Sequence, residues 1–185
     1  EIGSGLVGSE MCIRDSFTAA PDAVGAVGLG GGPLLDVPLC AGGRAWRVHC
    51  VAVGNPHCVL FTHEPPPAGA ELAAWGRALG HHPAFPGGIN VEFAQPISPT
   101  GLAVTVWERG SGATLACGTG ACAVAAAAVL TGRCPRGAPI LVQLPGGTLE
   151  VCVQRDDTVL LTGDAAATFS GTVLIQPCKA PRGVV

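Results

Sequence analysis

One stretch, residues 107–133, constrains the fold of this chain more than any other. It reads WERGSGATLACGTGACAVAAAAVLTGR: a charged pair, a Gly-Ser-Gly bend, Cys117, and then an Ala/Val run. Alanine is the best helix former and a glycine just past the run is a normal stop signal, so a helix is predicted over about 119–131. Apolar residues lie on nearly every side of this helix, which predicts that the rest of the chain buries it.

Cys117 is predicted at or just before the N-terminus of that helix. The positive end of the helix dipole and the free N–H groups there favour a thiolate, which predicts a lowered pKa for Cys117. The small residues 118–120 allow a carboxylate or phosphate to reach the same N–H groups. A reactive thiol and an anion site are therefore expected together. The alternative is an inert buried cysteine followed by a plain helix cap.

Composition narrows the class of protein. Hydrophobic residues make up 48% of the 185 residues and charged residues 12%, so a sizeable core is available and the composition of disordered chains is missing. The length fits one domain or a compact pair. A net charge of −3 without a basic run gives no reason to expect nucleic acid or an anionic membrane as partner. No apolar run approaches the roughly 20 residues of a spanning helix, and no signal peptide is visible.

Cysteine and histidine usage predicts neither a metal nor a cofactor. The nine cysteines are odd in number, irregularly spaced and without a Cys-x-x-Cys, so free thiols in a reducing compartment are expected. His81 and His82 are chain neighbours with no further ligand cluster. The glycine-rich run 28–32 lacks the strand and helix of a dinucleotide site.

The pattern along the chain predicts an α+β fold in which an antiparallel, barrel-like sheet surrounds the buried helix. A helix over 71–79 places Leu72, Trp75 and Leu79 on one face. Residues 1–16 show neither strand nor helix period and differ in composition from the remainder, so a cloning or assembly artefact is suspected; residues 17–43 have weak strand character. The predicted strands are 45–53, 54–61 (after a turn), 89–94, 102–107, 140–144, 148–153, 158–162 and 171–175.

Three further motifs carry candidate site residues. In GNPH (54–57), the proline holds Asn55 extended so that its amide can face a ligand, and His57 can serve as acid or base. Asn90 follows two glycines at the mouth of a strand. Glu108 and Arg109 can clamp an ammonium and a carboxylate just before the cysteine loop. The alternatives are turn asparagines, an exposed histidine and an ordinary surface ion pair.

Taken together, these segments resemble diaminopimelate epimerases, specifically their C-terminal half. The matching stretches are GNPHCVLF (54–61), LGHHPAFPGGINVEFAQ (79–95) and ERGSGATLACGTGACA (108–123). Proline racemases are similar in fold and in the Cys-Gly-Thr-Gly loop but more distant elsewhere. The resemblance implies two similar domains, each a barrel-like sheet around a helix, with the active site between them.

The resemblance also implies an activity, the cofactor-free epimerisation of LL-2,6-diaminopimelate to the meso form in lysine and peptidoglycan biosynthesis. One cysteine thiolate removes the α-proton and a second thiol supplies a proton from the opposite face. Cys122 lies a helical turn inside the predicted helix, so a packing role is expected for it. Carried over onto this sequence, the catalytic residues are Cys117, His57 and Glu108, and the substrate-binding residues are Asn55, Asn90, Glu108, Arg109, Gly118 and Thr119.

The sequence departs from the family at its N-terminal side. The second catalytic cysteine belongs to a Met-Cys-Gly-Asn-Gly motif, whereas Met11-Cys12 is followed here by Ile-Arg-Asp. The expected divisions are a non-family segment (1–16), a linker and strand (17–43), a C-terminal epimerase domain (44–163), and a return strand with a polar tail (164–185). Such a chain is expected to be an incomplete, weakly active or inactive epimerase.

Several alternatives stay open. The chain could be a related proline racemase-like isomerase, a cysteine hydrolase that uses Cys117 and His57, or a non-catalytic domain that binds an amino acid. The expected partner is diaminopimelate alone, without nucleic acid or membrane, and the full-length family suggests a homodimer. The expected location is the cytoplasm, or the plastid stroma in a photosynthetic eukaryote.

Overall fold

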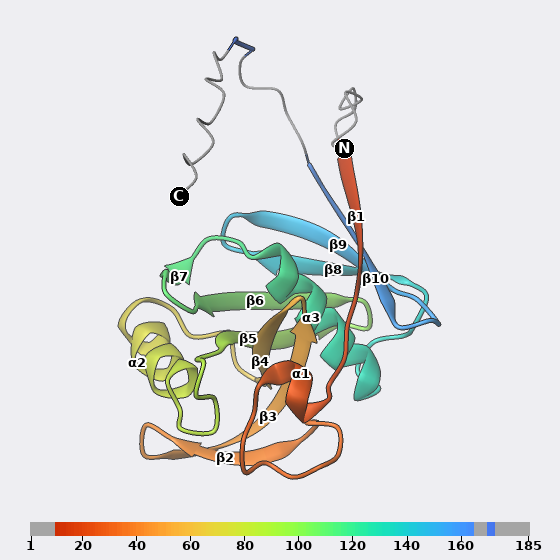
Figure 1. The fold of residues 1–185 in the computed structure, drawn as a ribbon. Helices are drawn as coiled ribbons and strands as arrows, with labels where there is room; N and C mark the ends of the chain where they lie inside the picture. Colours follow the sequence, from red (N-terminus) through yellow and green to blue (C-terminus); the bar gives the residue numbers. More distant parts are fainter. Residues whose placement is uncertain (1–9, 165–169, 173–185) are drawn as a thin grey trace, which may run out of the picture.

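A mixed sheet of ten strands surrounds one buried helix in this computed structural model, which describes residues 10–164 and 170–172 (Figure 1). The helices are α1 (Pro21–Val24), α2 (Gly69–Gly80) and α3 (Gly118–Leu130). The strands are β1 (Glu10–Ser16), β2 (Val37–Ala41), β3 (Arg44–Val53), β4 (Asn55–Phe61), β5 (Asn90–Ser98), β6 (Gly101–Glu108), β7 (Gly112–Thr114), β8 (Pro139–Leu144), β9 (Gly147–Val153) and β10 (Thr158–Asp164). The α+β prediction is confirmed.

Helix α3 is the buried centre of the fold, as its sequence predicts. Every residue from Gly120 to Ala128 is buried, and the helix packs against strands β3, β4, β5, β8, β9 and β10. In Figure 1 it crosses the middle of the molecule, with strands on either side of it. Its alanines are small, which allows the strands to approach its backbone on all sides.

The two faces of the sheet build two cores. Side chains alternate along a strand, so Val51 and Val53 of β3 face α3 whereas Val48 and Cys50 face α2. The same alternation places Phe93 of β5 on the α2 side. Glu92 and Ala94 therefore point to the α3 side, which matters for the site.

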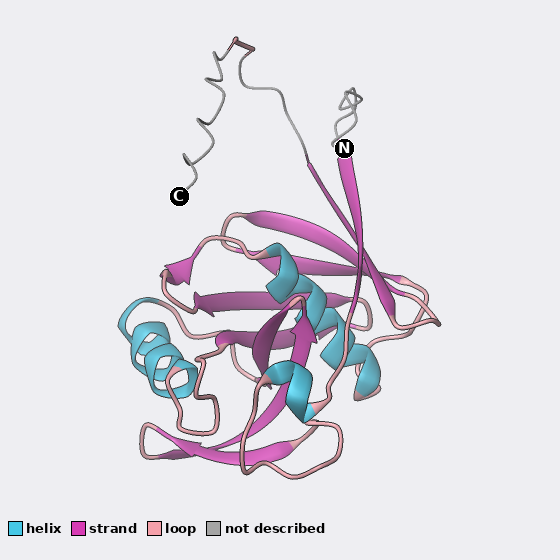
Figure 2. Cartoon of the chain, in the orientation of Figure 1, coloured by secondary structure: helices cyan, strands magenta, loops and turns pink. Residues whose placement is uncertain are grey.

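The prediction that the sheet is antiparallel is wrong for two pairs of neighbouring strands. Figure 2 shows the strands of the sheet in magenta and the helices in cyan. Strands β4 and β5 run parallel, and so do β6 and β8. In each case a helix, α2 or α3, lies between the two strands in the chain and returns it to the same end of the sheet, which is the usual way to connect parallel neighbours. In the order of paired strands, β1 stands at one edge of the sheet and β2 at the other. The described strands therefore form an open sheet and not a closed barrel.

Most local predictions between residues 45 and 162 are confirmed. The predicted helix 71–79 lies within α2, where Leu72 and Leu79 are buried. Trp75 is only partly buried and stacks edge-on against Trp46, with ring centroids 5.1 Å apart. The predicted strands correspond to β3–β6 and β8–β10, and β5 continues past its predicted end to Ser98.

The prediction is wrong for the start of the chain. Residues 10–16, expected to lack strand structure, form β1 and pair antiparallel with β10. This pairing uses backbone groups at the sheet edge, so it requires no alternating side-chain pattern. Helix α1 was also not predicted. The predicted strand 171–175 falls largely outside the described residues, and 171–172 have no regular structure. No helix among the described residues is long and apolar enough to cross a membrane.

Candidate active site

Cys117 caps the N-terminus of α3. Its Sγ accepts a hydrogen bond from the backbone N–H of Gly120 at 3.3 Å and lies 3.6 Å from the hydroxyl oxygen of Thr119. Gly120 fits here because it lacks a side chain: a Cβ would lie 2.9 Å from Oε1 of Glu92 and 3.2 Å from Sγ of Cys117. The first N–H groups of a helix have no acceptor within the helix, so this turn can also bind an anion.

The prediction of a lowered pKa for Cys117 is wrong. Burial is the largest influence and raises the pKa of this thiol above its usual value. The hydroxyl of Thr119 and the N–H of Gly120 act in the opposite direction, and the carboxylates of Glu92 and Glu108 raise the pKa further. Desolvation and nearby negative charge therefore outweigh the favourable helix end and favour the protonated thiol.

Thr119→Val is expected to move the pH profile of Cys117 alkylation to higher pH. The hydroxyl of Thr119 lowers the pKa of Cys117, so its removal raises that pKa and reduces the thiolate present at any given pH. The rate of iodoacetamide alkylation at Cys117, followed by mass spectrometry across a pH series, measures the shift.

The matched control for this substitution is Thr131→Val at the other end of α3. The hydroxyl of Thr131 donates to the carbonyl of Ala127 at 2.6 Å and lies far along the helix from the thiol. Its removal is expected to leave the alkylation profile of Cys117 unchanged. A Thr119→Val profile that coincides with the wild-type profile would refute the role of the hydroxyl.

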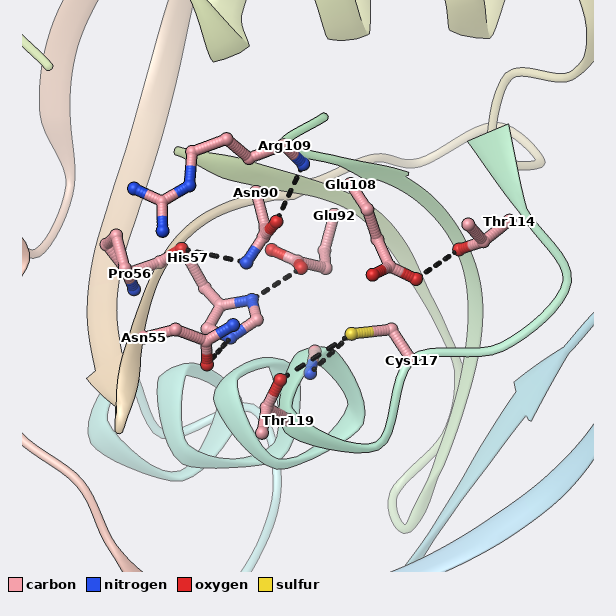
Figure 3. A network of polar contacts seen from close by, with 11 residues as sticks. Asn55, Pro56, His57, Asn90, Glu92, Glu108, Arg109, Thr114, Cys117 and Thr119 are labelled. Carbon is pink, nitrogen blue, oxygen red and sulfur yellow. Dashed lines mark hydrogen bonds and ion pairs between the residues drawn. The ribbon is translucent and has the colours of Figure 1, made fainter. Parts of the chain in front are cut away.

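A buried hydrogen-bonded chain links Glu92, His57 and Asn55 (Figure 3). Nδ1 of His57 lies 2.7 Å from Oε1 of Glu92, and both side chains are 0% exposed. Nε2 of the same ring lies 2.9 Å from Oδ1 of Asn55, which is half-buried. The parallel register of β4 and β5 brings these residues together, since it places His57 opposite Asn90 and Val59 opposite Glu92.

Asn90, on β5, joins β4 to the residue that follows β6. Its Nδ2 donates to the carbonyl of Pro56 at 3.2 Å, and its Oδ1 accepts from the backbone N–H of Arg109 at 2.8 Å. The guanidinium of Arg109 is exposed and donates to the carbonyl of Gly87 at 2.8 Å. The buried amide of Asn90 thus holds β4, β5 and the end of β6 in register around the thiol.

Glu108 and Arg109 do not bond to each other in the described contacts. Glu108, at the end of β6, accepts a hydrogen bond from the hydroxyl of Thr114 on β7 at 2.6 Å. This contact leaves its second carboxylate oxygen for another group. The ordinary surface ion pair that the sequence left open is therefore not the arrangement in the structure.

The structure brings the predicted site residues into one region around the N-terminus of α3. Figure 3 shows all of them except Gly118, which is the first residue of that helix. Sequence reasoning missed Glu92 and Thr114. Glu92 had one available signal: it follows Asn90 by two residues in an otherwise apolar strand, so both side chains lie on the same face. Thr114 had none, because its contact depends on the short strand β7.

Cys122, His81 and His82 have structural contacts outside the candidate site. Cys122 is buried one turn into α3, and burial raises its pKa to about 12, which fits its expected packing role. His81 and His82 hydrogen-bond to the backbone carbonyls of Arg77 and Cys40. Within the described residues no cluster of three potential ligands for a metal ion is found, and every cysteine whose side chain is described is free.

The fold of the chain is similar to that of two solved structures, one named an epimerase and the other a probable racemase. A hydroxyproline epimerase from Agrobacterium vitis superposes with a TM-score of 0.60 at 17% identity, over 84% of this chain and 50% of that one. A probable proline racemase from Agrobacterium radiobacter K84 superposes with a TM-score of 0.58 at 16% identity, over 90% of this chain and 54% of that one. These similarities concern the fold alone.

Among proteins of this fold, the chain belongs to the diaminopimelate epimerase family, whose sequence profile matches residues 49–168. It is 50% identical over 139 residues to the diaminopimelate epimerase of Microcystis aeruginosa NIES-843, over 75% of this chain and 48% of that protein. It is 53% identical over 141 residues to the diaminopimelate epimerase of Synechococcus sp. JA-2-3B'a(2-13), over 75% of this chain and 49% of that protein. The chain thus spans about half the length of these relatives.

Proposed function

We propose that this chain carries the C-terminal half of the active site of a cofactor-independent diaminopimelate epimerase. The observation that carries the proposal is the position of Cys117, at the end of a buried helix and in the same region as His57, Asn55, Asn90 and Glu108. The chain that holds these residues is 50% identical over 139 residues to a diaminopimelate epimerase. The reaction interconverts LL-2,6-diaminopimelate and its meso form, a step of lysine biosynthesis.

The chemistry accounts for the residue types. The α-proton of an amino acid is weakly acidic, so a carbanion must be stabilised by fixed hydrogen-bond donors in a site that holds little water. Cys117 serves as one acid or base, and its raised pKa makes its thiolate a stronger base once formed. The first turn of α3, at Gly118 and Thr119, binds the carboxylate next to the reacting carbon.

The remaining residues bind and orient the substrate. Asn55 and Asn90 supply amides, Arg109 supplies a guanidinium for a carboxylate, and Glu108 supplies a carboxylate oxygen for an ammonium group. His57 lies near the reacting centre within hydrogen-bonding distance of Asn55. These roles follow from the chemistry of each group and from the resemblance to the family.

The second thiol of a two-cysteine mechanism is assigned to the part of the family that this chain does not span. Cys122 is unsuited to the role because it is buried and its pKa is raised to about 12. Leu115, two residues before Cys117, is 70% exposed, which is unusual for a large apolar side chain beside a reactive group. An additional domain that covers this loop would complete the site.

Two alternatives have less support. A cysteine hydrolase needs His57 to activate Cys117, but the ring nitrogens of His57 contact Glu92 and Asn55 while the thiol contacts Gly120 and Thr119. A proline racemase-like substrate is supported only by fold similarity at 16–17% identity. We place the protein in the cytoplasm, or in a plastid stroma, with diaminopimelate as its small-molecule partner and a homodimer as the assembly of the complete enzyme.

The test is exchange of the α-proton in D2O with LL- and meso-diaminopimelate. The chain alone is expected not to interconvert the two isomers, because one thiol cannot serve both faces of the α-carbon. A chimera that joins residues 44–185 to the uncovered half of the Microcystis relative is expected to interconvert them and to incorporate deuterium. Interconversion by the chain alone would refute the claim that it carries only half of the active site. A folded but inactive chimera would refute the assigned activity.

A further inference from the structure

Glu92 is a buried, ionisable group of the site that the proposed function leaves without a role. It is fully buried on β5, on the face of the sheet that packs against α3. A buried carboxylate is costly unless it is paired and hydrogen-bonded. Its Oε1 contacts Nδ1 of His57 at 2.7 Å, and its Oε2 has no hydrogen-bond partner within the described part of the chain. A residue that carries such a cost in the centre of a site needs an explanation.

The contacts of His57 determine how many protons the group holds. Nε2 faces Oδ1 of Asn55 at 2.9 Å, and an amide carbonyl oxygen can only accept, so Nε2 carries a proton. Nδ1 faces a carboxylate oxygen, and a hydrogen bond between these atoms needs one further proton. That proton resides on either the ring or the carboxyl group. In both cases the pair of Glu92 and His57 is electrically neutral overall, which makes its burial tolerable.

We propose that Glu92 is a positioning residue that acts through His57. Its carboxylate shares one proton with Nδ1, which keeps Nε2 as a hydrogen-bond donor, and Nε2 in turn fixes the orientation of the Asn55 amide. The Nδ2 group of Asn55 is then directed away from the ring. The positioning role rests on the proposed function, because Asn55 is there a substrate-binding residue.

The location of Glu92 suits this role. Glu92 is held by its strand on one side and by α3 on the other, since its Oε1 lies where a side chain on Gly120 would stand. The ring of His57 is also fully buried, so neither partner can turn without opening the core. A rigid, water-free pair of this kind orients a neighbouring group better than a solvated one.

Two substitutions separate positioning from support of the fold. Glu92→Gln keeps the shape and can donate its amide N–H to Nδ1, so Nε2 keeps its proton and Asn55 keeps its orientation. Glu92→Leu removes every hydrogen bond to Nδ1 and leaves a buried ring nitrogen without a partner. Glu150, an exposed carboxylate on β9, offers the matched controls Glu150→Gln and Glu150→Leu.

The experiment is NMR of the 185-residue chain labelled with 15N in histidine rings and in asparagine side chains. Asn55 and Asn90 are the only asparagines in the sequence, so the amide spectrum contains two pairs of signals. The His57 signals are assigned with His57→Gln. The wild type is expected to show a protonated Nε2 and a far-downfield proton between Nδ1 and Glu92.

The variants are expected to differ in one specific way. Glu92→Gln loses the far-downfield proton and the protonation of Nδ1 but keeps the Asn55 amide signals in place. Glu92→Leu displaces both the His57 and the Asn55 signals, whereas the Glu150 variants leave them unchanged. Should Glu92→Leu fail to fold, the loss of the far-downfield proton in Glu92→Gln tests whether Glu92 shares that proton with His57.

Two results would overturn the proposal. One is a wild-type spectrum in which Nε2 of His57 carries no proton. The other is a far-downfield signal that persists in Glu92→Gln, or an Asn55 signal that stays in place in Glu92→Leu. The spectra require neither substrate nor turnover, so a failure of exchange in the D2O experiment counts against the proposed function alone.

Discussion

Cys117→Ala is expected to abolish most of the α-proton exchange of the chimera. Removal of a positioned acid or base typically lowers the rate by about 10²–10⁴-fold, and alanine offers no group that can take or return the proton. The thiol lies at the helix N-terminus with its Sγ held by the N–H of Gly120, so no neighbouring cysteine of the described chain replaces it. The measurement is deuterium incorporation at the α-carbons of LL- and meso-diaminopimelate, followed by NMR.

Cys122→Ala is the matched control for this variant. Cys122 lies on the same helix, one turn further in, and differs from Cys117 in being buried with a pKa raised to about 12. Its replacement is expected to change exchange by less than about threefold, as substitutions outside the proton path do. Near-wild-type exchange in Cys117→Ala would remove Cys117 from the mechanism, and equal losses in both variants would point to damage of α3 instead.

Phe93→Ala is expected to cause the largest loss of stability among single core substitutions. Phe93 is 0% exposed and lies on the α2 side of β5, where its ring packs against Trp46 and Trp75 at centroid distances of 5.9 Å and 6.1 Å. Truncation of a buried phenylalanine typically lowers the free energy of unfolding by about 3–5 kcal/mol, since apolar contacts are lost and a cavity remains.

Urea denaturation followed by circular dichroism measures this loss. Because domains are typically stable by only about 5–15 kcal/mol, the variant should unfold at a clearly lower urea concentration. Leu141→Ala is the control, since Leu141 on β8 is 44% exposed, and it should change stability by no more than about 0.5–1 kcal/mol. A Phe93→Ala protein as stable as Leu141→Ala would show that the α2-side core contributes little.

The buried central helix was predictable because its evidence is local. A run of alanines and valines with glycines at both ends specifies helix, boundaries and burial from residues that adjoin in the chain, and α3 begins and ends within one residue of the prediction. The strands followed from their alternation for the same reason. Strand β1 was missed because backbone pairing to β10 supplies structure that no local pattern encodes.

The candidate site was predictable as a set of residues but not as an arrangement. Asn55, His57, Asn90, Glu108, Arg109 and Cys117 were identified in the sequence through their motifs. That they surround one helix end follows from the tertiary structure. The two parallel pairings could not be predicted from periodicity, since alternation is the same in parallel and antiparallel strands.

By itself, the sequence determined the buried helix, most of the strands, the thiol at the helix end and the family resemblance, because each depends on short stretches of neighbouring residues. The tertiary structure alone decided the partner of His57 and the direction of the Cys117 pKa. The register of β4 and β5 brings Glu92 to His57 across 35 residues of chain. Burial then outweighs the helix end at Cys117, and burial is a property of everything packed around a group.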